Sequence, residues 1–278
     1  MKTKKYLSFT SLRQMVSDQI LTWPDSRRQN STDHSLHDTV MSALACMYFQ
    51  DPSLLQFQKE MEQMYHQNNL RTLFGVQTIP SSNTMKDILD NQESRRFHPT
   101  FKNIVQRLRR GKQLSQFNLL DNLTVCSIDA TQYHSSESVR CQQCLTKHKE
   151  NQDKPTVYQH SALQAALMHP DMKQVIPIMA EPIKNGDGTI KQDCETNAAK
   201  RLIPLLRQQF PKMGLIVVGD DLFSRQPMIE TVLANNLHFF FVAKPTSHKH
   251  MMKWIDTNES LIEEVKEVDE KGRTIVAH

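Results

Sequence analysis

The feature that most constrains the fold is a change of hydrophobic period near Leu119. From Ser35 to about Lys112, apolar residues recur three or four positions apart, which is the spacing of amphipathic helices. After Leu119, short runs of β-branched and apolar residues are separated by polar turns, which is typical of strands. We therefore predict a helical N-terminal domain over 1–117 and a sheet-based domain over 118–257.

Three strands are predicted in succession, in LTVCSIDATQY, KPTVYQHSALQAALM and QVIPIMAEPI. A helix follows at about 193–209, then the strand GLIVVGDD, a helix at 226–235, the strand LHFFFVAKP and a helix at about 248–256. The apolar runs LIVV and FFFV indicate central strands covered on both faces. A three-strand meander followed by alternating helices and strands is the order of the ribonuclease-H-like fold. We predict this α/β class, with a mixed sheet and helices on both faces.

Polar residues mark the predicted starts of the N-terminal helices. Ser35 precedes one helix, and Asp51 precedes a second with Pro52 at the first helical position. A third helix is capped at Ser81 or Ser82 and follows a tight turn. This third helix is either one more bundle helix or an element that enters a DNA groove.

Positive charge gathers at the end of the helical domain. The net charge of +4 and pI near 8.7 fit a nucleic-acid partner, although many other proteins share such values. The segment 93–112 has Glu93 as its only acid. Its cations are candidates for phosphate contacts, the alternative being a solvated helix face. They are Arg95, Arg96, Lys102, Arg107, Arg109, Arg110 and Lys112.

The chain has no recognisable export or membrane signal. The N-terminus MKTKKYLSF is basic but lacks the apolar core of a signal peptide, and no run approaches the roughly 18 apolar residues of a membrane helix. We expect a cytoplasmic protein with no membrane partner. Its five cysteines are expected to be reduced thiols.

Two aspartates lie at the ends of predicted strands. Asp129 follows Ile128 in the first strand, and Asp220 closes LIVVGD. Carboxylates from neighbouring strands can hold two Mg²⁺ ions about 4 Å apart, which activate a water or 3′-hydroxyl and stabilise the leaving oxygen of a phosphodiester. The alternative is that both aspartates cap turns. Asp221 competes with Asp220, but alternate strand residues face opposite sides, so only one can point into the site.

Cys141 and Cys144 have the spacing of a zinc knuckle. His148, His160 and Cys194 are candidates to complete a structural zinc site. The alternative is two reduced cysteines in a turn.

Several motifs follow one another along the chain. These are IDATQY with the following SS and cysteine pair, YQHSAL, KQDCETNAAKRL, VVGDDLF and FFFVAKPTSHK. In the order and spacing of these motifs, the chain resembles DDE transposases of insertion sequences of the IS-four type. DPSLLQF, IPSSNTMKDILD and LRRGK resemble the same proteins, so the resemblance covers nearly the whole chain. It implies a nucleoid-associated enzyme with a ribonuclease-H-like core, three acidic residues that bind Mg²⁺ or Mn²⁺, and homodimers acting on paired double-stranded DNA ends. Its first two acidic positions fall on Asp129 and Asp220. Ala130 departs from the glycine that relatives usually carry.

The resemblance places the third acid, a glutamate, on a late helix after a mostly β insertion. The segment 258–278 alternates in strand fashion around EKGR and is interpreted as the start of that insertion. Glu259, Glu263 and Glu264 come too early to match the missing glutamate. We expect from this a truncated chain that is inactive on its own.

Three cations near the predicted sheet edge are further candidates for DNA contacts. Arg225 follows Asp220 closely, and Lys244 and His248 come just after a predicted strand. The alternative for each is ordinary loop solvation.

Three functions follow from these observations. The first is a transposase that cuts and joins DNA at insertion-sequence ends. The second is a non-catalytic DNA-binding fragment that represses transposition. The third is a ribonuclease-H-like nuclease unrelated to mobile DNA, against which the resemblance of the N-terminal part argues.

Overall fold

The computed structural model describes residues 5–28, 32–120, 122–147, 156–185, 192–258, 265–268 and 274–277. His148, Glu259, Glu263 and Glu264, which the sequence analysis considered, lie outside these ranges.

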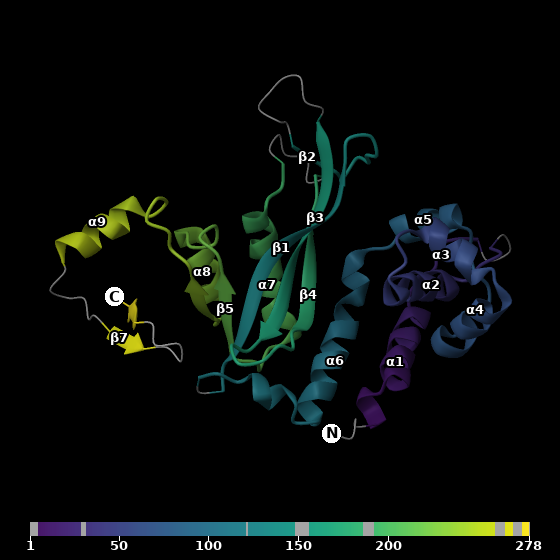
Figure 1. Ribbon diagram of the computed structural model, residues 1–278, viewed down its shortest axis with the longest axis horizontal. Coiled ribbons are helices and arrows are strands. Elements are labelled where there is room, and N and C mark those ends of the chain that lie inside the picture. Colours follow the sequence, from purple (N-terminus) through teal and green to yellow (C-terminus); the bar gives the residue numbers. More distant parts are fainter. Residues whose placement is uncertain are drawn as a thin grey trace.

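The N-terminal region is helical, as predicted (Figure 1). Serine side chains accept hydrogen bonds at the starts of four helices, at Ser8, Ser35, Ser53 and Ser81. The prediction of an Asp51 cap is wrong, because the extended Ser53 accepts from Gln56 N and the helix begins after it. The elements are η1 (Lys5–Leu7), α1 (Phe9–Leu21), α2 (Leu36–Phe49), α3 (Leu54–Met61), α4 (Met64–Asn69), η3 (Leu70–Phe74), α5 (Ser82–Asp90), η4 (Ser94–Phe97), α6 (His98–Arg110) and η5 (Leu114–Phe117).

A buried carboxylate ties α2 to the segment after η3. Asp38 accepts hydrogen bonds from the backbone N–H groups of Gln77 (3.2 Å) and Thr78 (3.0 Å) and from the Thr78 hydroxyl. Burial by itself would raise the pKa of Asp38, but the nearby His37 and these hydrogen bonds outweigh burial and lower it. The ionised carboxylate therefore stabilises the packing of the helical region.

The later part of the chain forms a six-stranded mixed sheet in the order β2-β3-β1-β5-β6, with β4 also paired to β3. β1, β3 and β4 are antiparallel neighbours, whereas β1, β5 and β6 run parallel. This topology confirms the predicted ribonuclease-H-like class; the short β2 was not predicted. The strands are β1 (Thr124–Ser136), β2 (Leu145–Lys147), β3 (Val157–Met168), β4 (Ile176–Ile183), β5 (Leu215–Gly219) and β6 (His238–Phe241).

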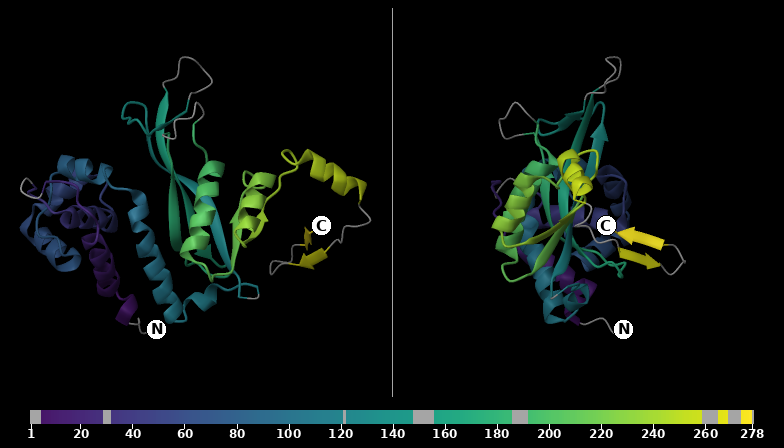
Figure 2. Two further views of the ribbon diagram at one scale, coloured as in Figure 1. Left: turned by 180° about the vertical axis from the view of Figure 1, so that it is seen from behind. Right: turned by 90° about the vertical axis from the view of Figure 1, so that its left-hand side faces the viewer.

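Two crossover helices pack side by side on one face of the sheet (Figure 2, left). α7 (Glu195–Gln209) leads to β5 and α8 (Gln226–Ala234) leads from β5 to β6. Both connections move in the same direction across the sheet, so right-handed crossovers place both helices on the same face. In the described residues β6 pairs only with β5, and Phe240 is 68% exposed. The prediction that FFFV is a central strand covered on both faces is therefore wrong.

α6 joins the helical region to the sheet. It lies alongside β4 (Figure 1), and its Val105 belongs to the core of the sheet domain. Near the C-terminal end of β4, the buried Glu181 accepts hydrogen bonds from Arg95, which precedes α6, and from Arg201 of α7. The two regions thus share both apolar and ionic contacts.

Beyond β6, the chain forms α9 (Lys249–Thr257) and a separate antiparallel pair, β7 (Val265–Val268) and β8 (Thr274–Ala277). The predicted strands of the tail are present in these ranges. None of the described helices has the length and apolar character needed to cross a bilayer.

Candidate catalytic site

Two neighbouring parallel strands bring Asp129 and Asp220 to the same level of the sheet. In the ladder between β1 and β5, Thr124 pairs with Leu215 and Ser127 with Val218, a constant offset of 91 residues (215 − 124 = 91). Continuing this offset beyond the last pair aligns Asp129 with position 220 (129 + 91 = 220). Neighbouring strands lie about 4.8 Å apart, so Asp129 in the middle of β1 lies beside Asp220, which directly follows β5. The prediction that Asp129 lies at the end of its strand is wrong, because β1 continues to Ser136.

Both carboxylates are exposed, and each makes one local hydrogen bond. Asp129 Oδ1 accepts from its neighbour Ala130 N (2.8 Å), and Asp220 Oδ1 accepts from Leu222 N (3.0 Å). Within the described ranges, neither forms an ion pair with Lys, Arg or His. The turn-cap alternative accounts for one oxygen of each carboxylate, and the second oxygen of each has no hydrogen bond within the described residues.

Gly219 positions Asp220 by allowing a close approach. A Cβ at residue 219 would lie 2.7 Å from the Cδ2 atom of Phe223 and 3.4 Å from the Cγ1 atom of Ile128. Phe223 is fully buried beneath this turn. Because residue 219 has no side chain, the ring of Phe223 can pack directly against its backbone, and this contact sets the path of the loop after β5.

Asp221 faces a different set of partners from Asp220. It accepts hydrogen bonds from Lys244 N (2.6 Å) and from the Ser247 hydroxyl (2.6 Å to each oxygen). These bonds lower the pKa of Asp221, and the bond from Lys244 N has the largest effect. Asp221 thus holds the turn between β6 and α9, which leaves Asp220 as the exposed aspartate at the strand end.

Three cations predicted to contact DNA meet at this same turn: Lys244 and His248 belong to it, and Arg225, at the start of α8, contacts it. Arg225 donates to the Ser247 carbonyl (3.0 Å), and His248 Nε2 lies 3.2 Å from Asp221 Oδ1 without hydrogen-bond geometry. Lys244 contributes its backbone N–H to Asp221, and the residue is exposed. Contacts of these three residues with DNA stay predictions.

Glu195, which the sequence analysis did not select, is a third acid beside the pair. It is the first residue of α7 and is half-buried. Burial raises the pKa of Glu195, and the negative charges of Asp220 and Asp129 raise it further. The signal in the sequence was an acid directly after the N-cap Cys194, which by itself is an ordinary feature of helix starts.

The acidic residues suit a hard divalent cation by their chemistry and charge. Asp129, Asp220 and Glu195 offer oxygen ligands, the type that Mg²⁺ and Mn²⁺ prefer. Burial and the negative charges of Asp220 and Asp129 raise the pKa of Glu195, so they disfavour its charged form, whereas a cation would favour it. Among described residues, the three carboxylates do not form a set whose ligand atoms all lie within 4.8 Å of one another. The residues present fit a metal chemically, in an open arrangement.

Three of the seven cations predicted at 93–112 make contacts inside the protein. Arg95 pairs with Glu181 (3.0 Å), and Arg107 donates to the Tyr6 carbonyl (2.8 Å). Arg96 lies 5.7 Å from the centre of a tryptophan ring in the helical region. These cations hold the N-terminal region against α6 and the sheet.

Of the other four cations, Arg109, Arg110 and Lys112 lie at or just after the C-terminal end of α6, whereas Lys102 lies in its first half. Arg109, Arg110 and Lys112 are exposed, whereas Lys102 is half-buried. No hydrogen bond or ion pair of these side chains is found within the described ranges. They are the members of the predicted set most available to phosphates.

Arg109 and Lys112 also line a cleft of about 380 Å³ together with Lys212. Thr124, at the start of β1, lines the same cleft. Because Thr124 precedes Asp129 by five residues, this basic cleft lies roughly 17 Å from the carboxylates along the strand. The basic surface therefore lies at the start of β1, and the acidic site lies in the middle of this strand.

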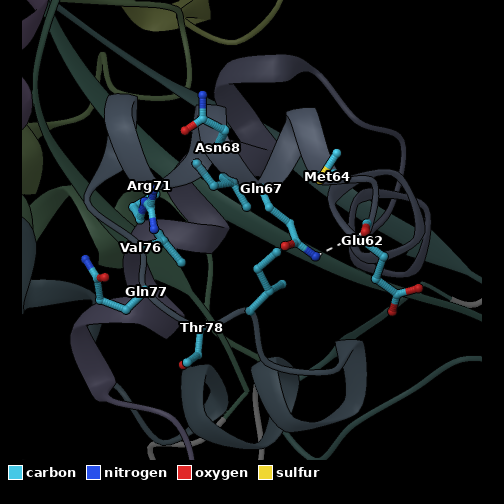
Figure 3. A pocket seen from close by; sticks show the side chains of 10 residues that line it. Glu62, Met64, Gln67, Asn68, Arg71, Val76, Gln77 and Thr78 are labelled. Carbon is cyan, nitrogen blue, oxygen red and sulfur yellow. Dashed lines mark hydrogen bonds between the residues drawn. The ribbon is translucent and has the colours of Figure 1, made fainter.

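A larger cleft, of about 620 Å³, lies within the helical region (Figure 3). It is bordered by α4, η3 and the segment 76–79, and two of its lining residues are joined by a hydrogen bond from Gln67 to the Glu62 carbonyl (3.1 Å). Its lining holds Arg71 and several amides, with no cluster of acids. We assign it no part in the catalytic site.

The predicted cysteine pair meets a histidine. Cys141 Sγ and Cys144 Sγ each lie 3.3 Å from His160 Nε2. Of the candidate zinc ligands, the structure thus brings together the pair and His160, while Cys194 precedes α7 and is exposed.

No family model matches the chain, and no curated protein matches it. Several solved structures are similar. The piggyBac transposase synaptic complex with hairpin DNA is 12% identical with a TM-score of 0.41, and the match covers 93% of this chain and 55% of that one.

The Drosophila P element transposase strand transfer complex is 10% identical with a TM-score of 0.30, and the match covers 95% of this chain and 53% of that one. The Mos1 strand transfer complex is 13% identical with a TM-score of 0.24, and the match covers 87% and 75%. The chain spans about half the length of the first two of these proteins.

Proposed function

We propose that this chain is a transposase of the DDE type that binds double-stranded DNA and cleaves and transfers phosphodiester bonds at the ends of an insertion sequence. The observation that carries the proposal is the alignment of Asp129 with Asp220 on neighbouring parallel strands of a ribonuclease-H-like sheet. The motifs IDATQY and VVGDDLF, which contain these residues, support the same assignment.

Asp129 and Asp220 would hold Mg²⁺ or Mn²⁺, with Glu195 as the nearest additional carboxylate. Such a cation supplies Lewis-acid stabilisation of charge on the attacking and leaving oxygens of a phosphodiester. The protein would contribute the placement of its ligands: β1 and β5 fix the two aspartates, and α7 fixes Glu195. Burial and, to a smaller extent, the charges of Asp220 and Asp129 raise the pKa of Glu195, and a cation held by these acids would favour the ionised form of Glu195.

DNA would contact the exposed cations at the end of α6. Arg109, Arg110 and Lys112 carry charges with no partner inside the described part of the protein. Side chains of this kind bind the phosphate backbone without reading its sequence. Two copies of the chain acting on paired element ends complete the proposal.

The test is cleavage of a supercoiled plasmid that carries the element ends, with Mg²⁺ or Mn²⁺ present. Asp129→Asn and Asp220→Asn should lower the nicking rate about 1,000-fold, because each removes several kcal/mol of transition-state stabilisation. Glu195→Gln should lower it by a smaller factor. Asp171→Asn is the matched control, since it removes one exposed aspartate from the loop between β3 and β4.

The alternative is a DNA-binding chain that occupies element ends without cutting them and so represses transposition. This alternative is supported by the spacing of Asp129, Asp220 and Glu195, because among the described residues their ligand atoms do not all lie within 4.8 Å of one another. This alternative predicts retarded DNA in a gel-shift assay and no metal-dependent nicking by the unmodified chain. Nicking that persists unchanged in Asp129→Asn would contradict the catalytic assignment.

A further inference from the structure

The outer end of the β1–β3 hairpin carries a cluster of sulfur and nitrogen atoms that the proposed function does not use. His160 lies on β3, and Cys141 and Cys144 lie in the loop before β2. The Sγ atoms are 3.7 Å apart, and each lies 3.3 Å from His160 Nε2. In the described ranges, this is the group of metal-ligating side chains whose ligand atoms all lie within 4.8 Å of one another.

These distances match the edges of a tetrahedral zinc site. With Zn–S near 2.3 Å and Zn–N near 2.0 Å, tetrahedral angles place two sulfurs about 3.8 Å apart and a sulfur and a nitrogen about 3.5 Å apart. The observed sulfur–sulfur separation of 3.7 Å is far longer than the roughly 2.05 Å of a disulfide. Two thiolates and an imidazole are also the ligand types that Zn²⁺ prefers.

The loop is folded so that its backbone supports a metal-bound thiolate. Cys141 N–H points at Cys144 Sγ (3.2 Å), and Cys144 N donates to the Cys141 carbonyl (3.3 Å). An N–H directed at a sulfur is the kind of contact that orients a cysteine ligand around a metal. Cys144 is buried, so the site is partly shielded from water.

His134 on β1 is the candidate for a fourth ligand. His134 is the register partner of His160, and the two rings lie 5.8 Å apart at an interplanar angle of 45°. Two imidazoles that share a tetrahedral zinc have ring centres about 5 to 6 Å apart by the same bond lengths. His134 lies outside the group whose ligand atoms are all within 4.8 Å of one another, so its side chain would have to move to complete the site.

We propose that Cys141, Cys144, His160 and His134 bind one Zn²⁺ that fixes the loop before β2 onto the outer end of the β1–β3 hairpin. The site is structural: all four ligands come from protein, and His134 lies five residues beyond Asp129, roughly 17 Å along the strand. The ligand set replaces Cys194 with histidines from the two long strands. This proposal does not depend on the catalytic assignment.

The experiment measures zinc in the full chain purified under reducing conditions. The wild-type protein should contain one zinc per chain and, after exchange into Co²⁺, should show the thiolate charge-transfer and tetrahedral d–d absorption bands. Cys141→Ser, Cys144→Ser and His160→Ala should each lower zinc affinity by more than about 100-fold, since even changes around a metal's ligands cost roughly 10- to 100-fold. His134→Ala should lower it at least tenfold.

Cys194→Ser is the matched control, because it removes an exposed cysteine outside the cluster and should leave zinc content unchanged. A wild-type protein without zinc, or one that holds a Cys141–Cys144 disulfide under these conditions, would overturn the proposal. Equal zinc affinity in His134→Ala and wild type would overturn the four-residue site. DNA nicking plays no part in these readouts, so the zinc proposal and the catalytic proposal fail separately.

Discussion

At the scale of single residues, two adjacent aspartates show how environment assigns different roles to one residue type. Asp221 is held by the Lys244 backbone and the Ser247 hydroxyl, whereas Asp220 is exposed with one bond to a nearby N–H. The sequence predicted that only one of them could face the site, because alternate strand residues point to opposite sides. The contacts of the turn before α9 decide which one does.

Gly219 is the residue on which the placement of Asp220 depends. In Gly219→Ala, the new Cβ would meet the buried ring of Phe223 at 2.7 Å, so the ring or the loop must move. We expect a loss of about 1 to 3 kcal/mol in the free energy of unfolding, the usual cost of overpacking. Urea denaturation measures this loss, and the nicking rate should fall with it.

Adding Phe223→Leu to Gly219→Ala tests the cause of that loss. The smaller side chain leaves room for the new methyl group, so the double variant should be more stable than the sum of the two single changes predicts. Strict additivity would show that the Cβ does not act through Phe223.

At the scale of elements, helix ends and strand ends carry the polar contacts that join one segment to the next. Asp38, in the first turn of α2, reaches residues 77 and 78, about 40 positions later in the chain. Arg109, Arg110 and Lys112, at the end of α6, instead point their charges outward. Charged side chains at helix ends therefore stabilise packing in α2 and are available to a binding partner at the end of α6.

Asp38→Asn should destabilise the protein in a pH-dependent way. The pKa of Asp38 is lower in the folded than in the unfolded protein, so its ionised form stabilises the fold above its ordinary pKa near 3.8. That contribution is lost as the pH falls through the lowered folded value. We expect Asn to cost about 2 kcal/mol at pH 7, with the gap to wild type narrowing below pH 3.8. Urea denaturation at several pH values across this range measures the difference in free energy of unfolding between Asp38→Asn and wild type. A difference that does not change with pH would contradict the prediction.

Replacing Arg109, Arg110 and Lys112 together with Ala should weaken DNA binding through lost phosphate contacts. Each contact contributes roughly 0.9 to the slope of log K against log salt, so the slope should become about 2 to 3 units less negative. Fluorescence anisotropy titrations at several salt concentrations measure the slope. Lys200→Ala, an exposed change on α7, is the matched control and should leave the slope unaltered. An unchanged slope in the triple variant would remove α6 from the DNA-binding surface.

At the scale of the whole molecule, one buried acid connects three parts of the structure. Glu181 on β4 accepts from Arg95 before α6 (3.0 Å) and from Arg201 on α7 (2.8 Å). Arg201 also binds Asp193, and these bonds overcome burial to hold the pKa of Asp193 below its ordinary value. The helical region, the sheet and the crossover helix are thereby fixed to one another.

Glu181→Gln should lower the free energy of unfolding by about 2 to 3 kcal/mol, because it removes the charge that two arginines share at a buried position. Arg95→Ala, at a half-exposed position, should cost less than about 1 kcal/mol. Denaturant unfolding of both single variants and the double variant gives the coupling between them. An absence of coupling would mean that Arg95 does not join the two regions through Glu181.

The sequence by itself determined the order of helices and strands and the position of Asp220 at the end of a strand, because these depend on local period and on the chemistry of neighbouring residues. Contacts between distant segments decided the rest. Only the folded chain turns Arg107 inward onto residues about 100 positions earlier, sets Glu195 beside the aspartates and brings His160 to the cysteine pair. A periodic pattern records which face of an element is apolar; it does not record which other element packs against that face, and each of these three outcomes depends on that packing.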